Sequence, residues 1–464
     1  MSTLLAACNS LVLGVILLYT CIFTLSIPHS SLLYVRLVIA PLAILCFWDF
    51  GLGPYRPSSL MFSGGTTAVG WYMIMRVIEH TVVGLWDPTA PHWVERAGKD
   101  SPRLGYPTPQ SFRERCFYAF DLLTSQRGSS WSPYLQWDWM PYRFKSWSPA
   151  ISSRHFLMAS LKSMLIQYLL IDLCDTITKS RTWDTSLQYP VSSLPVLEQV
   201  IFSVALCAGT FLSIDFGYTV TSATCVLCGS SPNSWPPMFD SPFSSTSLRD
   251  FWSHRWHRLF GRVFERLSIP LVYTTTPIIG LLVKDHHKKV YIASTIRPIA
   301  IFGLSTLLHL VIMHRVAQQA YRKNYTTNDP TFWDPGTFKF FMSQSLGVAF
   351  ESTVISRIAD WRFPSQEHSK AHHQTVQDMV PSAQSSPQVD VIQNGSANTL
   401  RSDARTGVHR WEREALTRVY VWLFLLWTGR WWADKWVRSG FFNENEIVVP
   451  FSIWRGLWHG KWRA

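Results

Sequence analysis

Charged residues are scarce in this chain: they make up 16% of its 464 residues, whereas hydrophobic residues make up 47%. Soluble domains carry about 25% charged residues, so the composition points to lipid. No Asp, Glu, Lys or Arg occurs between Ser2 and Val35, and Leu11–Ile27 is predominantly apolar. The start also lacks the basic residues and cleavage site of a secretory signal, so we expect an uncleaved membrane helix.

A cysteine framework and a metal motif are also missing. The eight cysteines are scattered, most of them in apolar runs, which predicts no disulfides. Cys225 and Cys228 form a CxxC without a second ligand pair, so packing is favoured over metal binding and we expect no metal site. The net charge is +12. In so apolar a chain we place the basic residues in cytosolic loops and against anionic membrane lipid, and we exclude nucleic acid as a partner.

About nine apolar segments are candidate membrane helices, and we expect eight to ten. Several carry a charge or a proline, which is costly against lipid, so we expect an all-α, polytopic fold whose helices surround a buried reaction chamber. Arg76, Glu79 and His80 must face protein or water. A tenth segment, Ile447–Trp458, is too short to span and is expected in the interface. The nine candidates are Leu11–Ile27, Ser31–Trp48, Ala68–Trp86, Phe156–Ile177, Leu197–Val220, Leu267–Val283, Ser294–Met313, Phe338–Ile355 and Leu416–Trp432.

Polar segments divide the chain into five regions. Residues 1–92 hold the N-terminal membrane helices, and residues 93–154 form a polar, basic loop rich in Trp and Pro. Residues 155–363 form the core, and residues 411–464 hold the C-terminal membrane helix and the interfacial segment. Residues 364–410 contain few large apolar side chains and are predicted to be disordered.

The basic loops give an orientation. Two candidate spans separate the Arg-rich loops Trp93–Arg154 and Arg249–Arg266, which places both in the cytosol. Lys284–Lys289 is also basic but lies only one span further on. Either Leu267–Val283 is a re-entrant hairpin or the charge rule fails there, and both alternatives stay open.

One histidine stands out inside an apolar helix. His309 lies in the second half of Ser294–Met313, and Ser305 and Thr306 share its helix face because they precede it by four and three residues. A core histidine satisfied by a helix–helix hydrogen bond is one interpretation. An ionisable group in hydrocarbon is costly, however, and marks a functional site by default.

The segment from Trp235 to Arg262 concentrates Arg, Trp and His between apolar neighbours. If residues 248–264 are helical, Arg249, Trp252 and Trp256 recur on one face, while Arg255, Arg258 and Arg262 fall on another. Such a helix would lie at the membrane surface. Its arginines could bind anionic lipid or a phosphorylated carrier such as coenzyme A.

These motifs resemble those of the membrane-bound O-acyltransferases, most closely the fungal wax synthase-like branch. The resemblance extends from about Phe117 to Glu351. The chain differs from the family pattern at two places. It has Ser305-Thr306 where the family has Ser-Gly, and His257 where sterol and diacylglycerol acyltransferases carry Asn. The matching residues are Ser247-Leu-Arg-Asp-Phe-Trp252 with Trp256-His257, Ser305 with His309, Trp235-Pro-Pro-Met-Phe239 with Pro242, Asp121-Leu-Leu123 with Arg127, Gly128 and Trp131, and Gln344 with Gly347 and Glu351.

The resemblance implies transfer of an acyl group from acyl-coenzyme A, a co-substrate, to a hydrophobic alcohol by a multi-pass protein of the endoplasmic reticulum, without a bound cofactor. His309 would be the general base, and His257 or Asp250 would orient the acyl group or stabilise the oxyanion. No Gly-x-Ser-x-Gly elbow is present. The residues expected to bind coenzyme A or substrate are Arg249, Trp252, Arg255, Trp256, Arg258, Ser305 and Thr306.

Within this branch, the chain is more similar to acetyltransferases that act on terpenoid and meroterpenoid hydroxyls in fungal secondary metabolism. A long-chain acyltransferase that forms wax or sterol esters is the alternative. A transporter would require a buried relay and is disfavoured because no inverted repeat is visible between the two halves. A lipid-binding scaffold would not need a histidine at position 309. No oligomeric state follows from the sequence.

Overall fold

The computed structural model describes residues 2–55, 57, 59–83, 91–95, 109–125, 137–140, 152–256, 259–282, 286–327, 329–351, 354, 396–443 and 445–463. The chain divides into two compact units. The first comprises Met1–Asp240, Trp256–Ser345 and Leu426–Ala464, and the second comprises Ser241–Arg255 and Leu346–Leu425.

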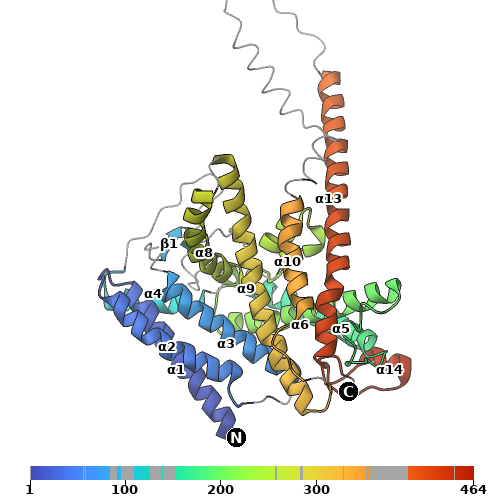
Figure 1. Ribbon diagram of the computed structural model, residues 1–464, viewed down its shortest axis with the longest axis horizontal. Coiled ribbons are helices and arrows are strands. Elements are labelled where there is room, and N and C mark those ends of the chain that lie inside the picture. Colours follow the sequence, from blue (N-terminus) through green and yellow to red (C-terminus); the bar gives the residue numbers. More distant parts are fainter. Residues whose placement is uncertain are drawn as a thin grey trace, which may run out of the picture. The chain divides into compact units, whose positions relative to one another are not determined.

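The first unit begins with three helices packed in sequence order: α1 (Ser2–Leu25), α2 (Leu32–Leu52) and α3 (Leu60–Thr81) (Figure 1). Leu18, Phe47 and Val77 form the centre of their shared core. Gly70 allows α2 and α3 to approach closely, because a Cβ there would lie 2.7 Å from the Phe47 carbonyl oxygen. Helix α4 (Phe112–Thr124) packs against α1 and begins with a capping box.

The remaining helices of this unit complete its core. Helices α5 (Ser153–Thr178) and α6 (Val196–Leu227) form one pair, and α8 (Gly261–Leu282) and α9 (His286–Arg322) form another (Figure 1). Strands β1 (His92–Glu95) and β2 (Trp137–Met140) pair antiparallel, with His92 opposite Met140. Near the C-terminus, α14 (Ile453–His459) packs on α5, where the Asp172 carboxylate accepts hydrogen bonds from the amides of Ile453 and Trp454.

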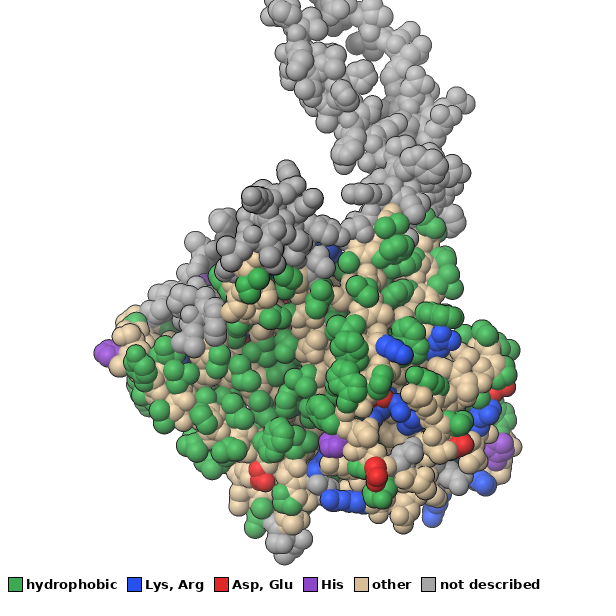
Figure 2. Space-filling model, viewed as in Figure 1, with side chains coloured by type: hydrophobic (Ala, Val, Ile, Leu, Met, Phe, Trp, Pro, Cys, Tyr) green, Lys and Arg blue, Asp and Glu red, His purple; other side chains and the backbone are tan. Residues whose placement is uncertain are grey.

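Five helices of the described chain are long and apolar enough to cross a bilayer. Their outward side chains are apolar, as at Ile16, Val38 and Leu45, and Figure 2 shows hydrophobic side chains spread over the surface around α1 to α3. The expectation of a helical membrane protein is therefore confirmed. The four other candidates coincide wholly or largely with α3, α8, α10 (Pro335–Phe350) and α13 (Ser396–Arg438). The five spans are Thr3–Leu25, Leu32–Leu52, Ser153–Thr178, Val196–Leu227 and Ile296–Arg322.

Helix α8 settles one alternative left open by the sequence. Residues 261–282 form one continuous helix through Pro270 and Pro277, so Leu267–Val283 is not a re-entrant hairpin as far as Leu282. A proline removes one helix hydrogen bond without forcing the chain to reverse. The side-chain hydroxyls of Thr274 and Thr275 donate to the carbonyls of Pro270 and Leu271, so the turns around the first proline are bonded through side chains as well.

The three ionisable residues of α3, Arg76, Glu79 and His80, are buried and face protein, one of the two surroundings that the sequence allows. Arg76 and Glu79 are 1% and 3% exposed. The Glu79 carboxylate pairs with Arg76 at 3.0 Å and with Arg262 of α8 at 3.1 Å, and Arg76 also donates to the Leu122 carbonyl at the end of α4. This ionic cluster therefore joins α3, α4 and α8 in the interior of the unit.

The second unit differs from the expectation of one helix over residues 248–264. It contains a single α turn, α7 (Leu248–Asp250), followed by a π-helical stretch, η4 (Phe251–Arg255), whereas α8 begins only at Gly261 in the other unit. The Glu351 carboxylate accepts from the amides of Leu248 and Arg249 at 2.9 and 3.3 Å, and so caps the start of α7.

Helix α13 begins earlier than the polar composition predicts. Residues 396–410 are helical, although 364–410 was expected to be disordered, and 364–395 lie outside the described residues. The Ala, Leu and Arg residues of this stretch favour a helix even without an apolar face. A low content of large apolar residues therefore does not exclude a helix that continues from a packed one.

Candidate active site

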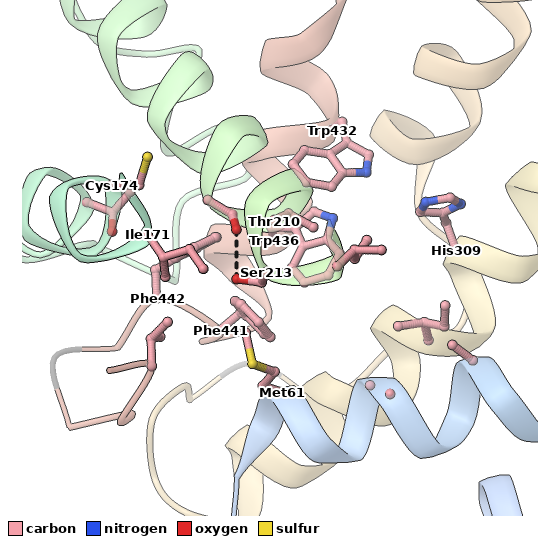
Figure 3. A pocket seen from close by; sticks show the side chains of 18 of the residues that line it. Met61, Ile171, Cys174, Thr210, Ser213, His309, Trp432, Trp436, Phe441 and Phe442 are labelled. Atoms are coloured by element: carbon pink, nitrogen blue, oxygen red, sulfur yellow. Dashed lines mark hydrogen bonds between the residues drawn. The ribbon is translucent and has the colours of Figure 1, made fainter. Parts of the chain in front are cut away.

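A cavity of about 250 Å³ lies inside the first unit and is bounded by side chains of α3, α5, α6, α9 and the end of α13. His309 of α9 lies on one side of it, and Trp432 and Trp436 of α13 lie on the other (Figure 3). The lining is predominantly apolar. Besides these three residues it includes Met61, Ala68, Ile171, Cys174, Ala205, Thr210, Ser213, Phe260, Leu308, Phe441 and Phe442.

The protonation of His309 follows from its hydrogen bond. Its Nδ1 lies 2.8 Å from the backbone carbonyl oxygen of Ser305, one turn earlier on α9. A carbonyl oxygen can only accept, so Nδ1 must carry the proton and donate it. In the neutral ring, Nε2 then carries a lone pair and no proton. Nε2 is therefore the atom that can act as a base. The ring of Phe341 lies 4.5 Å from the imidazole and limits its movement.

Ser305 and Thr306 share the helix face of His309, but neither side chain is hydrogen-bonded to it. The expected stripe of polar side chains therefore does not hold the imidazole. Ser305 contributes its carbonyl, and the Thr306 hydroxyl donates to the Phe302 carbonyl of its own helix at 2.8 Å. Neither side chain is among those that line the cavity. Trp256 lies in the same unit but packs on Phe211 and Phe239, with ring centroids 5.7 and 5.2 Å away. His257 and Arg258 lie outside the described residues.

The other predicted residues belong to the second unit. Asp250 accepts from Arg255 Nε at 2.5 Å, so these two oppositely charged side chains form one ion pair. The Asp250 amide donates to the Ser247 hydroxyl at 2.8 Å, which caps the α7 turn. Arg249 is held through its amide by Glu351, and the ring of Trp252 lies 4.9 Å from that of Phe251. This segment is thus ordered by local contacts within its unit.

Sequence reasoning missed the aromatic side of the cavity. Trp432 and Trp436 are four residues apart, so they lie on the same face of α13 with ring centroids 5.0 Å apart. The spacing is visible in the sequence, but the span expected there, Leu416–Trp432, ends before Trp436. What could not be seen is that α5, α6, α9 and α13 bring their side chains to one cavity, because those helices are far apart in the chain.

A charged network includes one residue of the cavity wall. Asp175, which lines the cavity, lies 2.9 Å from Lys179 Nζ and 3.1 Å from Arg455 of α14. Lys179 also donates to the Glu446 carbonyl at 2.6 Å. Burial lowers the pKa of Lys179, while the facing Asp175 carboxylate opposes that shift. The network ties the C-terminal segment to the end of α5.

Comparison with known proteins gives a family for the central segment. Residues 235–333 match the membrane bound O-acyl transferase family. The chain is 28% identical over 247 residues to the acetyltransferase ple2 of Rhodocybe pseudopiperita, covering 53% of this chain and 58% of that relative. It is 33% identical over 147 residues to the acetyltransferase aurG of Calcarisporium arbuscula, covering 31% of each.

A third relative is the acetyltransferase ataH of Aspergillus terreus, 27% identical over 139 residues, which are 30% of this chain and 39% of the relative. The chain therefore spans 58% of the length of ple2, 31% of aurG and 39% of ataH. The matched segment contains both the Arg-rich stretch and His309. Over this segment the chain resembles the membrane bound O-acyl transferase family, and over its matched parts it is similar to fungal acetyltransferases.

Proposed function

We propose that this protein transfers an acyl group from acyl-coenzyme A to the hydroxyl of a hydrophobic acceptor. The observation that carries the proposal is His309: its Nδ1 proton is committed to the Ser305 carbonyl, which leaves Nε2 as a base on the wall of an apolar cavity. The family match of residues 235–333 supports the same reaction class. An apolar cavity suits a hydrophobic alcohol.

The chemistry requires one base. Nε2 of His309 takes the proton of the alcohol while the alcohol oxygen forms a bond to the thioester carbonyl carbon. The carbon–sulfur bond then breaks, and the imidazolium returns its proton to the leaving thiolate. The products are the ester and free coenzyme A, so protons and electrons balance and no further reactant is needed.

The donor side of the proposal rests on the second unit and on Trp256 and Arg258. Arg249, Arg255 and Arg258 are proposed to bind the coenzyme A phosphates, and Trp252 and Trp256 are proposed as further coenzyme A-binding residues. Asp250 is proposed to hold Arg255 in place as well as to orient the acyl group, because the two side chains already form an ion pair. His257 is proposed as a donor to the developing oxyanion.

The finer assignments follow the relatives. The proposed donor is acetyl-coenzyme A, since ple2, aurG and ataH are all named acetyltransferases. The proposed acceptor is a terpenoid or meroterpenoid intermediate of fungal secondary metabolism. We further propose that the chain spans the endoplasmic reticulum membrane eight to ten times. Adding α3, α8, α10 and α13 to the five apolar helices gives nine spans.

Substitution of His309 tests the proposal. His309→Gln keeps a side chain of similar size but removes the base, so the rate of transfer should fall about 100-fold or more. The measurement is transfer of labelled acetyl or palmitoyl from its coenzyme A ester to a panel of terpenoid and fatty alcohols in microsomes with equal amounts of protein. An active Gln variant would refute the role of the base.

His314→Gln is the matched control, because it makes the same change five residues further along α9. The His314 side chain is hydrogen-bonded to Gln318 and is not among the described residues that line the cavity. Transfer by this variant should stay within about threefold of the wild-type rate. A preference for palmitoyl over acetyl would keep the reaction but replace the proposed donor.

A further inference from the structure

A second, smaller pocket of about 60 Å³ lies next to the cavity. Of the residues that the structure describes, Phe442 alone lines both. Its side chain is buried, with 8% of the residue exposed. We call the smaller one the polar pocket, because its lining includes Lys179, Arg181, Thr182, Thr185 and Asn443.

The turn after α13 fixes the place of Phe442. Gly440 has a φ of 73°, in the left-handed region that glycine adopts at little cost, and its amide donates to the Val437 carbonyl at 2.9 Å. Beyond this turn the ring centroid of Phe441 lies 4.7 Å from that of Trp436 and 5.1 Å from that of Phe442. The Phe442 ring is therefore held at the end of the aromatic side of the cavity.

Polar contacts tie the two linings together elsewhere. Asp175 in the cavity wall lies 2.9 Å from Lys179 in the polar pocket. The carbonyl of Thr178, in the cavity wall, accepts from Nε1 of Trp183, in the polar pocket, at 2.9 Å. At Phe442 the boundary is instead an apolar ring, so truncation of this side chain is the change that would join the two spaces.

The spaces on the two sides of Phe442 differ in polarity. Lys179 and Arg181 are each paired with a carboxylate, Asp175 and Glu198, at 2.9 Å. With its cations matched, the polar pocket suits a neutral polar group such as a hydroxyl better than an anion. A hydroxyl buried in the apolar cavity would lose its hydrogen bonds to water, which is unfavourable.

We infer that Phe442 is a specificity-determining residue, which ends the cavity at the polar pocket and so excludes acceptors with a second hydroxyl at that end. This inference rests on the proposed function for the identity of the reacting hydroxyl. In Figure 3 His309 and Phe442 lie on opposite sides of the cavity, so the excluded hydroxyl is the one remote from the base. The acceptor class is then an alcohol that is polar at one end only.

Binding of matched alcohols tests the inference without any acyl donor. The probes are tritiated primary alcohols from decanol to octadecanol and the α,ω-diols of the same lengths. The full chain is held in lipid nanodiscs as wild type, Phe442→Ala and Phe441→Ala. Phe441 is the matched control, because it is also 8% exposed and lines the cavity but is not among the described residues of the polar pocket. Partition of each probe into lipid is the same for all three proteins.

The wild type and Phe441→Ala should bind each alcohol about tenfold more tightly than the diol of equal length. In Phe442→Ala this preference should fall to about threefold or less for the longest pairs, whose second hydroxyl reaches the polar pocket, and persist for the shortest. If this variant does not fold, Phe442→Leu retains more apolar contact and should shift the preference in the same direction. An unchanged preference in the folded variant at position 442, an equal loss in Phe441→Ala, or no saturable binding of any alcohol to the wild type overturns the inference.

Adding acetyl-coenzyme A to the same samples separates the two proposals. A preference that depends on Phe442, with no ester formed by the wild type on any probe, would support the role of Phe442 and count against the proposed transferase. Ester formation by the wild type, with the same preference in all three proteins, would support the transferase and overturn the role of Phe442.

Discussion

Gly347 lies in α10 where a side chain has no room. A Cβ there would be 2.6 Å from the Phe424 ring and 2.8 Å from a methyl group of Leu248, the first residue of α7. Gly347→Ala should therefore destabilise the second unit by about 1–3 kcal/mol, although alanine favours a helix. The free energy of unfolding in mixed detergent micelles would measure this loss.

Gly429→Ala is the control for this prediction. No atom lies within 4 Å of a Cβ at Gly429, in the interior of α13, so alanine should stabilise the protein by up to about 1 kcal/mol through helix propensity. Stabilisation by both substitutions would show that helix propensity, and not the contacts with Phe424 and Leu248, decides the outcome at Gly347.

At the level of single residues, the sequence indicates a candidate base but not the contacts that position it. His309 could be found because it is an ionisable residue in an apolar helix. That Ser305 acts through its carbonyl could not be predicted, since every residue has one and only the ring orientation selects it. The capping of α7 by Glu351 joins residues about a hundred positions apart and likewise leaves no local pattern.

At the level of elements, the ionic cluster offers the sharpest test. Glu79 is the carboxylate that Arg76 and Arg262 share in the interior. Glu79→Gln leaves both guanidinium groups buried without that charge, so the free energy of unfolding should fall by about 3–5 kcal/mol. Equilibrium denaturation of the purified protein in detergent would measure the change.

Glu265→Gln provides the comparison, because it makes the same substitution on α8 at a pair that is exposed to solvent or lipid headgroups. Glu265 and Arg297 lie 3.4 Å apart with side chains 44% and 51% exposed. Exposed pairs contribute about 1 kcal/mol or less, so this variant should be nearly as stable as the wild type. A Glu79→Gln variant no less stable than Glu265→Gln would show that the cluster does not join the helices.

The sequence predicts where the helices lie better than it predicts how charged residues and prolines are accommodated within them. Each of the nine apolar segments coincides with a helix over most of its length, because length and hydropathy are local properties. Charges in α3 and prolines in α8 made those two ambiguous, and only the contacts resolve them: the charges pair with one another, and the prolines are accommodated within the helix. The break between η4 and α8 has no counterpart in the residue spacing.

At the level of the whole molecule, burial and exposure divide the apolar side chains between two tasks. The outward faces of α1 and α2 carry exposed Leu, Ile and Val, as a helix in lipid requires, while α9 and α13 turn His309 and two tryptophans toward the cavity. Hydropathy alone cannot distinguish a side chain that faces lipid from one that faces the cavity. The sequence therefore predicts a buried chamber but not the residues that line it.

The stretch 364–395 contains no Leu, Phe, Tyr or Trp, and so brings little apolar surface to any packed core. We expect that a Gly-Ser linker of equal length, which preserves the reach between the flanking segments, leaves the rate of acyl transfer within about threefold of wild type. The helical residues from Ser396 onward stay in place. A scrambled version of 364–395 with the same composition is the control. If the linker variant loses transfer while the scrambled one keeps it, composition matters there. If both lose it at normal protein levels, the native sequence of this stretch takes part in the reaction.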